Sequence, residues 1–198
     1  QFSIFFSVFC FLVFLNAFNM FDGINLQASL YSLIIFLILV IFFVNSLLLK
    51  ILIITLIFFS YLNFKNRSFL GDSGSLLLGY FISYFFIISY NLNYMIYADQ
   101  ITLFMLIPGL DLIRLFVSRI YRKKNPLSSD RNHIHHLLLR KYSYKFTITI
   151  ILLLIIFPIF LEYLKINIIF IIMITTLVYF TLILFIKKKK TTQWDKFH

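Results

Sequence analysis

Apolar residues fill seven long stretches of the chain, and short polar segments separate them. A helix needs about 20 mostly apolar residues to cross the hydrocarbon layer, since each residue rises about 1.5 Å and the backbone must bond within the segment. The run from Ala28 to Phe59 is too long for one helix and is interrupted only by Asn45, Ser46 and Lys50, so it counts as two. The pattern therefore predicts an all-α polytopic integral membrane protein, with spans near residues 1–20, 27–45, 47–63, 75–91, 99–118, 146–163 and 166–186.

Composition supports this fold class. Apolar residues make up 62% of the 198 residues and charged residues 13%, against about half and a quarter in soluble domains. The apolar content also excludes a disordered chain. We find no internal repeat or linker, so residues 1–198 are expected to form a single transmembrane domain.

The basic residues predict the orientation. The net charge is +11, and 16 of the 18 Lys and Arg residues lie in residues 64–74, 119–145 and 187–198 or at Arg114. Basic loops stay in the cytoplasm, so these segments and the C-terminus are predicted to be cytoplasmic. Because topology explains the charge, we expect no nucleic-acid partner. The run of lysines at 187–190 is interpreted as a membrane anchor that attracts anionic lipid.

Polar clusters fall at three places that this topology puts on the cytoplasmic side. Asp22 follows Asn16 and Asn19 in NAFNMFDGIN, and Asp72 lies in FLGDSGS. The third cluster contains Asp111, Arg114 and Arg119 near the end of the fifth span, followed by Asp130, Arg131, His133, His135 and His136 in the largest basic loop. Carboxylates suit Mg²⁺ and basic side chains neutralise phosphate, so the three clusters together favour a phosphoryl-transfer site.

Each cluster also has an interpretation without chemistry. Asn16 and Asn19 could join helices by hydrogen bonds. FLGDSGS could be a turn in which Asp72, Ser73 or Ser75 caps the next helix. The histidines are more typical of a solvated loop than of a zinc site, because no cysteine partners are present. Asp111 and Arg114 could form an intrahelical ion pair, and residues 119–124 could serve topology alone.

Three motifs in this order resemble one family, the polyprenyl-phosphate N-acetylhexosamine-1-phosphate transferases, and most closely their undecaprenyl-phosphate GlcNAc-1-phosphate branch. Phospho-N-acetylmuramoyl-pentapeptide transferase is a more distant relative. The motifs are NAFNMFDGIN at 16–25, LGDSGSLLLG at 70–79 with the preceding Phe69, and PLSSDRNHIHHLLLR at 126–140. The resemblance extends from Phe14 to about Arg140.

The resemblance implies a reaction and its partners. A polyprenyl phosphate attacks the sugar-linked phosphorus of a UDP-HexNAc, giving polyprenyl-diphosphate-sugar and UMP. The expected cofactor is Mg²⁺, with Mn²⁺ as a substitute. The expected location is the bacterial inner membrane, with the site facing the cytoplasm, where such enzymes begin the synthesis of cell-envelope polysaccharides such as O-antigen. The HexNAc, the pathway and the oligomeric state, monomer or homo-oligomer, are left open.

The resemblance also assigns roles. Asp72 is the expected Mg²⁺ ligand and, with Asp22, a catalytic residue. The expected substrate-binding residues are Asn16, Asn19, Asn25, Asp111, Arg119, Asp130, Arg131, His133, His135 and His136. Of these, Arg131 is suited to paired hydrogen bonds with phosphate and Asp130 to orienting the histidine loop.

Two departures from the family are expected to matter. The usual DGxDG reads Asp22-Gly23-Ile24-Asn25-Leu26, so an amide replaces one acid and Leu26 replaces one glycine. The family's first helices and an Asp-Asp pair upstream of the first motif are missing, so residues 1–198 alone are expected to be inactive. The alternative function is a transport protein or a noncatalytic paralogue that binds lipid phosphate.

Overall fold

The computed structural model describes residues 4–43, 46–92, 98–125 and 132–188. These residues form helices and connecting segments, with no strand among them, so the predicted all-α fold class is confirmed. The helices are α1 (Ile4–Phe21), α2 (Gln27–Phe42), α3 (Leu47–Phe64), α4 (Gly71–Asn91), α5 (Ala98–Tyr121), α6 (Ile134–Leu139), α7 (Tyr144–Tyr163) and α8 (Ile168–Lys188).

Six of the described helices are long and apolar enough to cross a membrane, rather than the predicted seven. The exception is α2, which has 16 residues and ends at Phe42, three residues before the predicted end of the second span. At about 1.5 Å per residue it is about 24 Å long, short of the hydrocarbon thickness of about 30 Å. The six-residue helix α6 lies in a segment that the sequence pattern assigned to a loop.

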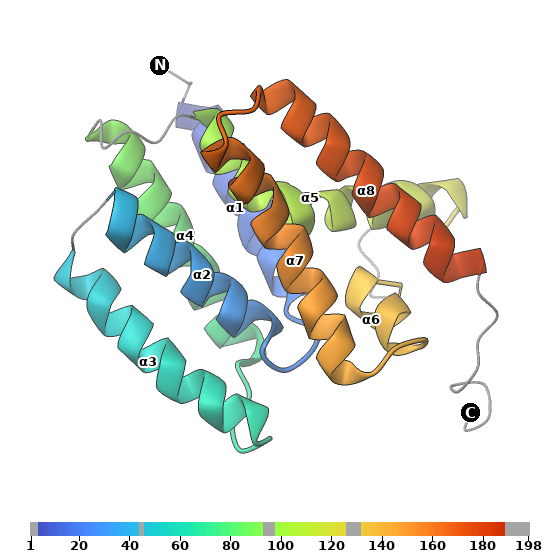
Figure 1. The fold of residues 1–198 in the computed structure, drawn as a ribbon, viewed down its shortest axis with the longest axis horizontal. Helices are drawn as coiled ribbons and strands as arrows, with labels where there is room; N and C mark the ends of the chain where they lie inside the picture. The colour runs from blue at the N-terminus through green and yellow to red at the C-terminus, as the bar shows by residue number, and fades with distance from the viewer. Residues whose placement is uncertain (1–3, 44–45, 93–97, 126–131, 189–198) are drawn as a thin grey trace. The chain divides into compact units, whose positions relative to one another are not determined.

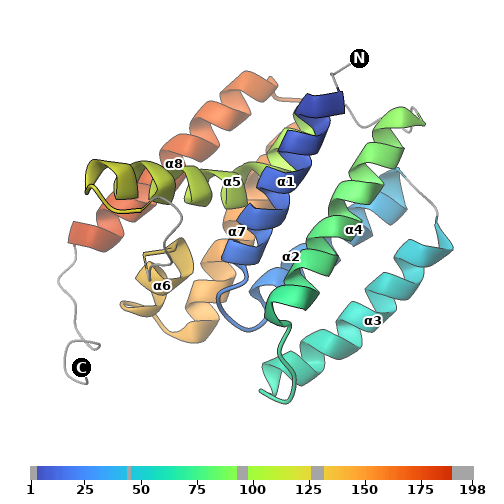
Figure 2. The same cartoon turned by 180° about the vertical axis from the view of Figure 1, so that it is seen from behind.

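The chain divides into two compact units, residues 1–105 and 106–198, and α5 begins in the first and ends in the second. In the first unit α1 packs against α4, and α2 packs against α3 and α4 (Figures 1 and 2). Gly79 permits the close approach of α1 and α4, because a Cβ atom there would lie 3.1 Å from Leu15 and 3.3 Å from Phe18. In the second unit α6 packs against both α7 and α8, which also pack against each other.

A buried tyrosine supplies a hydrogen bond that a proline removes from α5. Pro108 lies inside this helix and has no N–H to donate to the carbonyl of Phe104, four residues earlier. The hydroxyl of Tyr31, on α2, donates to that carbonyl oxygen at 2.5 Å instead. Tyr31 is fully buried against Phe18 and Phe21 of α1. The tyrosine therefore connects α1, α2 and the start of α5 within the first unit.

Candidate functional site

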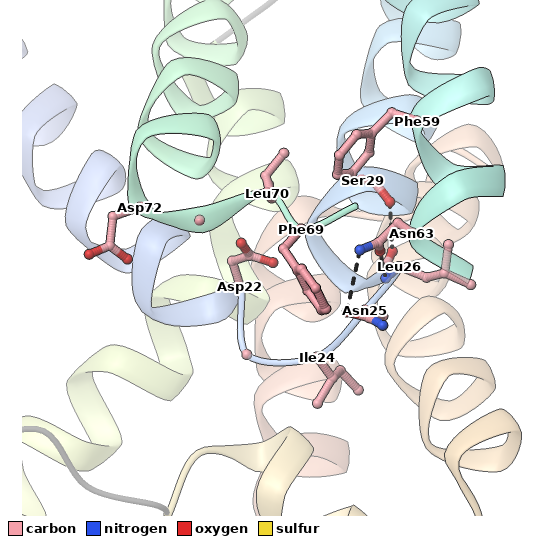
Figure 3. A pocket seen from close by; sticks show the side chains of 12 residues that line it. Asp22, Ile24, Asn25, Leu26, Ser29, Phe59, Asn63, Phe69, Leu70 and Asp72 are labelled. Carbon is pink, nitrogen blue, oxygen red and sulfur yellow. Dashed lines mark hydrogen bonds between the residues drawn. The ribbon is translucent and has the colours of Figure 1, made fainter. Parts of the chain in front are cut away.

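Two loops of the first unit meet to form a pocket of about 200 Å³. One loop connects α1 to α2 and the other connects α3 to α4, and Figure 3 shows their side chains around a common space. The lining residues are Asp22, Gly23, Ile24, Asn25, Leu26, Ser29, Phe59, Asn63, Phe69, Leu70, Gly71 and Asp72. The structure thus brings Asp22 and Asn25 of the first motif together with Asp72 of the second.

Asp22 lies just beyond the end of α1. Its amide donates to the carbonyl of Phe18 at 3.1 Å, which continues the helical bonding for one more residue. Its carboxylate points toward the start of α4 (Figure 3). Burial, and after it the negative charge of Asp72, raises the pKa of the Asp22 carboxyl from 3.8 to about 6. This carboxyl therefore titrates near pH 6 and is mostly ionised at neutral pH.

Asp72 is exposed in the first turn of α4, at the edge of the pocket away from Asn25 and Asn63 (Figure 3). The alternative that Asp72, Ser73 or Ser75 caps this helix is wrong, because all three lie inside it. The helix begins at Gly71, whose φ of 64° produces a sharp turn, and its cap residue Leu70 makes no side-chain bond. Asp72 is instead inside the helix, where the positive N-terminal dipole favours a carboxylate.

Asn19 joins α1 to α4 beside this turn. The hydroxyl of Ser75 donates to the Oδ1 atom of Asn19 and contacts the carbonyl of Asp72 at 3.1 Å. Asn16 does not take part, because its amide is exposed and donates to the carbonyl of Leu12 in its own helix at 2.9 Å. The spacing of three therefore brings Asn19 and Asp22 to the α4 side, and Asn16 lies one turn away from the pocket.

Asn63 organises the pocket, and sequence reasoning missed it. Its Oδ1 atom accepts from the backbone N–H of Leu26 at 2.6 Å. Its Nδ2 atom donates to the carbonyl of Ser68 at 2.8 Å and to Oδ1 of Asn25 at 3.3 Å. Asn25 in turn donates to Oδ1 of Asn66 at 2.6 Å. One buried amide at the end of α3 thus ties both pocket loops together, and a lone amide in an otherwise apolar helix end was the available signal.

Leu26 adopts a backbone conformation that favours glycine. Its φ is 67°, in the left-handed region that costs a side-chain-bearing residue about 1–2 kcal/mol. This is the position where the sequence resembles a glycine motif but carries leucine. The bond from the Leu26 N–H to Asn63 helps to hold this turn, so the departure from the motif leaves the loop conformation in place at an energetic cost.

A second cluster lies in the other unit around Asp111 of α5. Its carboxylate accepts from Arg114 at 2.6 Å, from Tyr179 of α8 at 2.6 Å and from the backbone N–H of Ile134 at 3.2 Å. The Nδ1 atom of His133 lies 2.9 Å from its other oxygen. The intrahelical pair with Arg114 is therefore present, but it is one part of a network that includes α6 and α8.

The histidines of the third motif are not a solvated loop, and that interpretation is wrong. His133 and His135 are 7% and 1% exposed, because residues 134–139 form α6, which packs against α7 and α8. The ring of His135 stacks on that of His133 with centroids 5.4 Å apart and lies 4.3 Å from that of His136. Burial, followed by the two neighbouring imidazoles, lowers the pKa of His135 to about 3, so this ring is neutral at physiological pH.

Three predicted site residues remain: Arg119, Asp130 and Arg131. Arg119 is buried in the last turn of α5. Asp130 and Arg131 lie outside the described residues. Among the described residues no group of three or more His, Cys, Asp or Glu side chains is placed to hold a metal ion. A metal in the pocket of the first unit would therefore depend on Asp22 and Asp72 together with ligands from substrate or water.

Comparison with known sequences finds a family match in the first part of the chain. Residues 1–90, which include the whole pocket, match glycosyl transferase family 4. This match confirms the predicted family resemblance over residues 1–90, which carry the first two motifs. No solved structure matches the chain.

Three similar proteins carry the same name, undecaprenyl-phosphate alpha-N-acetylglucosaminyl 1-phosphate transferase. The protein from Thermotoga maritima is 37% identical over 75 residues, which are 38% of this chain and 24% of that protein. Those from Haemophilus influenzae and Pasteurella multocida are 31% and 32% identical over 77 residues, which are 38% of this chain and 22% of each relative. The matched part thus spans less than a quarter of each relative's length.

Proposed function

We propose that this protein transfers a HexNAc-1-phosphate group, GlcNAc-1-phosphate in the first instance, from a UDP-sugar to a polyprenyl phosphate. An oxygen of the lipid phosphate forms a bond to the sugar-linked phosphorus. The bond from that phosphorus to the bridging oxygen breaks, and UMP leaves with the electron pair. The products are polyprenyl-diphosphate-sugar and UMP.

One observation carries this proposal: Asp22, in the α1–α2 loop, and Asp72, in the first turn of α4, line the same pocket. Asp22 and Asp72 lie 50 residues apart in the sequence but both line the space between the α1–α2 and α3–α4 loops. Asp72 contributes to the raised pKa of Asp22, so the two charges are close enough to repel each other. The names of the similar proteins support the same reaction class.

The residues of the pocket fit Mg²⁺. This ion commonly takes one or two protein carboxylates and completes its coordination with water and substrate phosphate oxygens. Asp72 and Asp22 provide such a pair, and a cation beside them would relieve their repulsion. When bound, Mg²⁺ would neutralise negative charge on the diphosphate during transfer.

The side chains have separate tasks in this proposal. Asp22 lies in the same pocket as Asp72 and would orient the lipid phosphate for attack. Asn19 and Asn25 offer amide hydrogen bonds to phosphate or nucleotide. Residues 130–136, with their three histidines, would bind the nucleotide end of the donor, and the buried Asp111 would hold this segment through the N–H of Ile134. In this arrangement positioning and electrostatics account for most of the rate.

The test is UMP release by the protein expressed from its complete open reading frame and purified in detergent. We expect UMP release that requires UDP-GlcNAc, undecaprenyl phosphate and Mg²⁺. D72N should lower kcat at least about 100-fold, because a charge that acts in the transition state is lost. The matched control is D99N, which changes an exposed carboxylate outside the pocket.

Two results would contradict the proposal. D72N with normal turnover would remove Asp72 from the chemistry. A wild-type protein that binds undecaprenyl phosphate and releases no UMP would favour the noncatalytic lipid-phosphate-binding function. Translating the DNA upstream of Gln1 bears on the same choice, because further spans with a cytoplasmic Asp-Asp pair would support a transferase. UMP release by residues 1–198 alone would contradict the expectation that they are inactive.

A further inference from the structure

Asp111 connects three elements of the second unit through one buried carboxylate. Its Oδ1 atom accepts from Arg114, Tyr179 and the N–H of Ile134, and its Oδ2 atom faces His133 Nδ1. The residue is 2% exposed. A buried carboxylate is stable only when it is paired and hydrogen-bonded. Here these contacts come from α5 itself, from α8 and from the start of α6.

The start of α6 has no side-chain cap of its own. His133 precedes the helix and its side chain makes no capping bond. The N–H of Ile134, the first residue of α6, has no acceptor within the helix. Asp111 supplies that acceptor from a neighbouring helix. The backbone of the histidine motif is therefore held by a residue 23 positions earlier, and α6 is too short to be stable without such support.

Arg114 and Tyr179 fix the position of this carboxylate. Arg114 donates to Asp111, to the Tyr179 hydroxyl oxygen at 2.9 Å and to the carbonyl of Asn132 at 2.7 Å. The Tyr179 hydroxyl accepts from Arg114 and donates to Asp111, which closes a ring of three groups. Arg114 also contacts the loop directly, so Arg114 and Asp111 both bond to residues 132–134, and Tyr179 holds these two side chains.

We propose that Tyr179 and Arg114 are positioning residues that hold Asp111, and through it the 132–136 segment, in the conformation that binds the donor nucleotide. The assignment of that segment to the donor rests on the proposed function. Neither side chain needs to touch the substrate. The role of Tyr179 resides in its hydroxyl group, which distinguishes it from a tyrosine that only fills the core beside Phe180.

The experiment compares full-length wild type, Y179F and Y163F. Y179F keeps the buried ring and removes only the hydroxyl, and Y163F makes the same change at an exposed position near the end of α7. Hydrogen–deuterium exchange of a peptide containing Ile134 reports the bond to Asp111 without requiring activity. We expect Y179F to accelerate exchange there about tenfold and to leave the α7 peptides unchanged.

Kinetics give an independent measure. Y179F should raise the KM for UDP-GlcNAc about fivefold with kcat within about twofold, since a loosened binding loop mainly loses ground-state contacts. Y163F should match wild type in both assays. Unchanged exchange at Ile134 in Y179F would overturn the positioning role. If wild type releases no UMP, the proposed function fails, while the exchange data still decide whether Tyr179 positions the segment.

Discussion

Asn63 is the residue whose replacement should disturb the pocket most clearly without touching the carboxylates. The substitution Asn63→Ala removes the acceptor of the Leu26 N–H and the donor to the Ser68 carbonyl. Leaving a buried donor or acceptor unsatisfied costs about 1–3 kcal/mol. Because both groups lie at the pocket edge and can recover some water, we expect a total loss of about 2–4 kcal/mol.

The isosteric substitution Asn63→Asp separates hydrogen bonding from shape. The carboxylate keeps the acceptor for Leu26, but it places a second oxygen against the Ser68 carbonyl and Oδ1 of Asn25, where the amide donated. It also adds negative charge to the pocket that holds Asp22 and Asp72. N63D should therefore be at least as destabilising as N63A at neutral pH, although it changes the side-chain volume least.

The assay is thermal unfolding of the full-length protein in detergent, with N91A as the control, an exposed amide at the end of α4. At roughly 2–4 °C per kcal/mol for a chain of this size, N63A should lower the midpoint by about 5–10 °C. N91A should stay within about 2 °C of wild type, as surface changes usually do. An N63A midpoint equal to that of N91A would refute the idea that this amide holds the two loops together.

Three other changes test the fold and the pocket. Y31F should lower stability by about 1–3 kcal/mol in denaturant titration, because the Phe104 carbonyl loses its donor; an unchanged midpoint would show that water replaces the hydroxyl. L26G should unfold at or above the wild-type temperature, whereas L26V should unfold several degrees below it, since a β-branched residue tolerates a φ of 67° poorly; the reverse order would contradict the strained conformation. With a pKa of about 6 when folded and 3.8 as the reference for the unfolded chain, Asp22 keeps its proton longer in the folded state, so stability falls as pH rises from about 4 to about 6. D22N should show less of this fall, and parallel melting profiles for wild type and D22N would exclude a raised pKa.

The lengths of the apolar runs predicted the long helices well, because a membrane span needs a minimum length of apolar residues. The expected spans at 47–63 and 146–163 correspond to α3, Leu47–Phe64, and α7, Tyr144–Tyr163. It could not predict α6, since a helix of six residues depends on contacts with distant groups such as Asp111. Hydropathy also did not predict that α2 ends at Phe42, before it reaches the length of a full span.

The charged residues of the candidate site were predicted from the sequence, whereas the neutral residues that hold its loops in place were not. Asp22 and Asp72 stand out because acids are rare in this sequence, and alternation of the predicted spans favours the same side for both. Asn63 and Tyr179 are single polar side chains in apolar helices, where tyrosine and asparagine also occur for other reasons. Their importance follows from partners that are 37 and 68 residues away, at Leu26 and Asp111, and no local pattern encodes these distances.

The bond from Tyr31 to the Phe104 carbonyl makes two distant positions interdependent in evolution. Proline at 108 removes a helical donor, and the tyrosine hydroxyl replaces it. Replacing Pro108 by alanine restores an N–H group that can donate to the Phe104 carbonyl within α5. With that donor present, replacing Tyr31 by phenylalanine no longer leaves the carbonyl unpaired. Homologues should accordingly accept the loss of the hydroxyl where the proline is also absent. A proline without the tyrosine should be rare among them, because the unpaired carbonyl would face a dry interior.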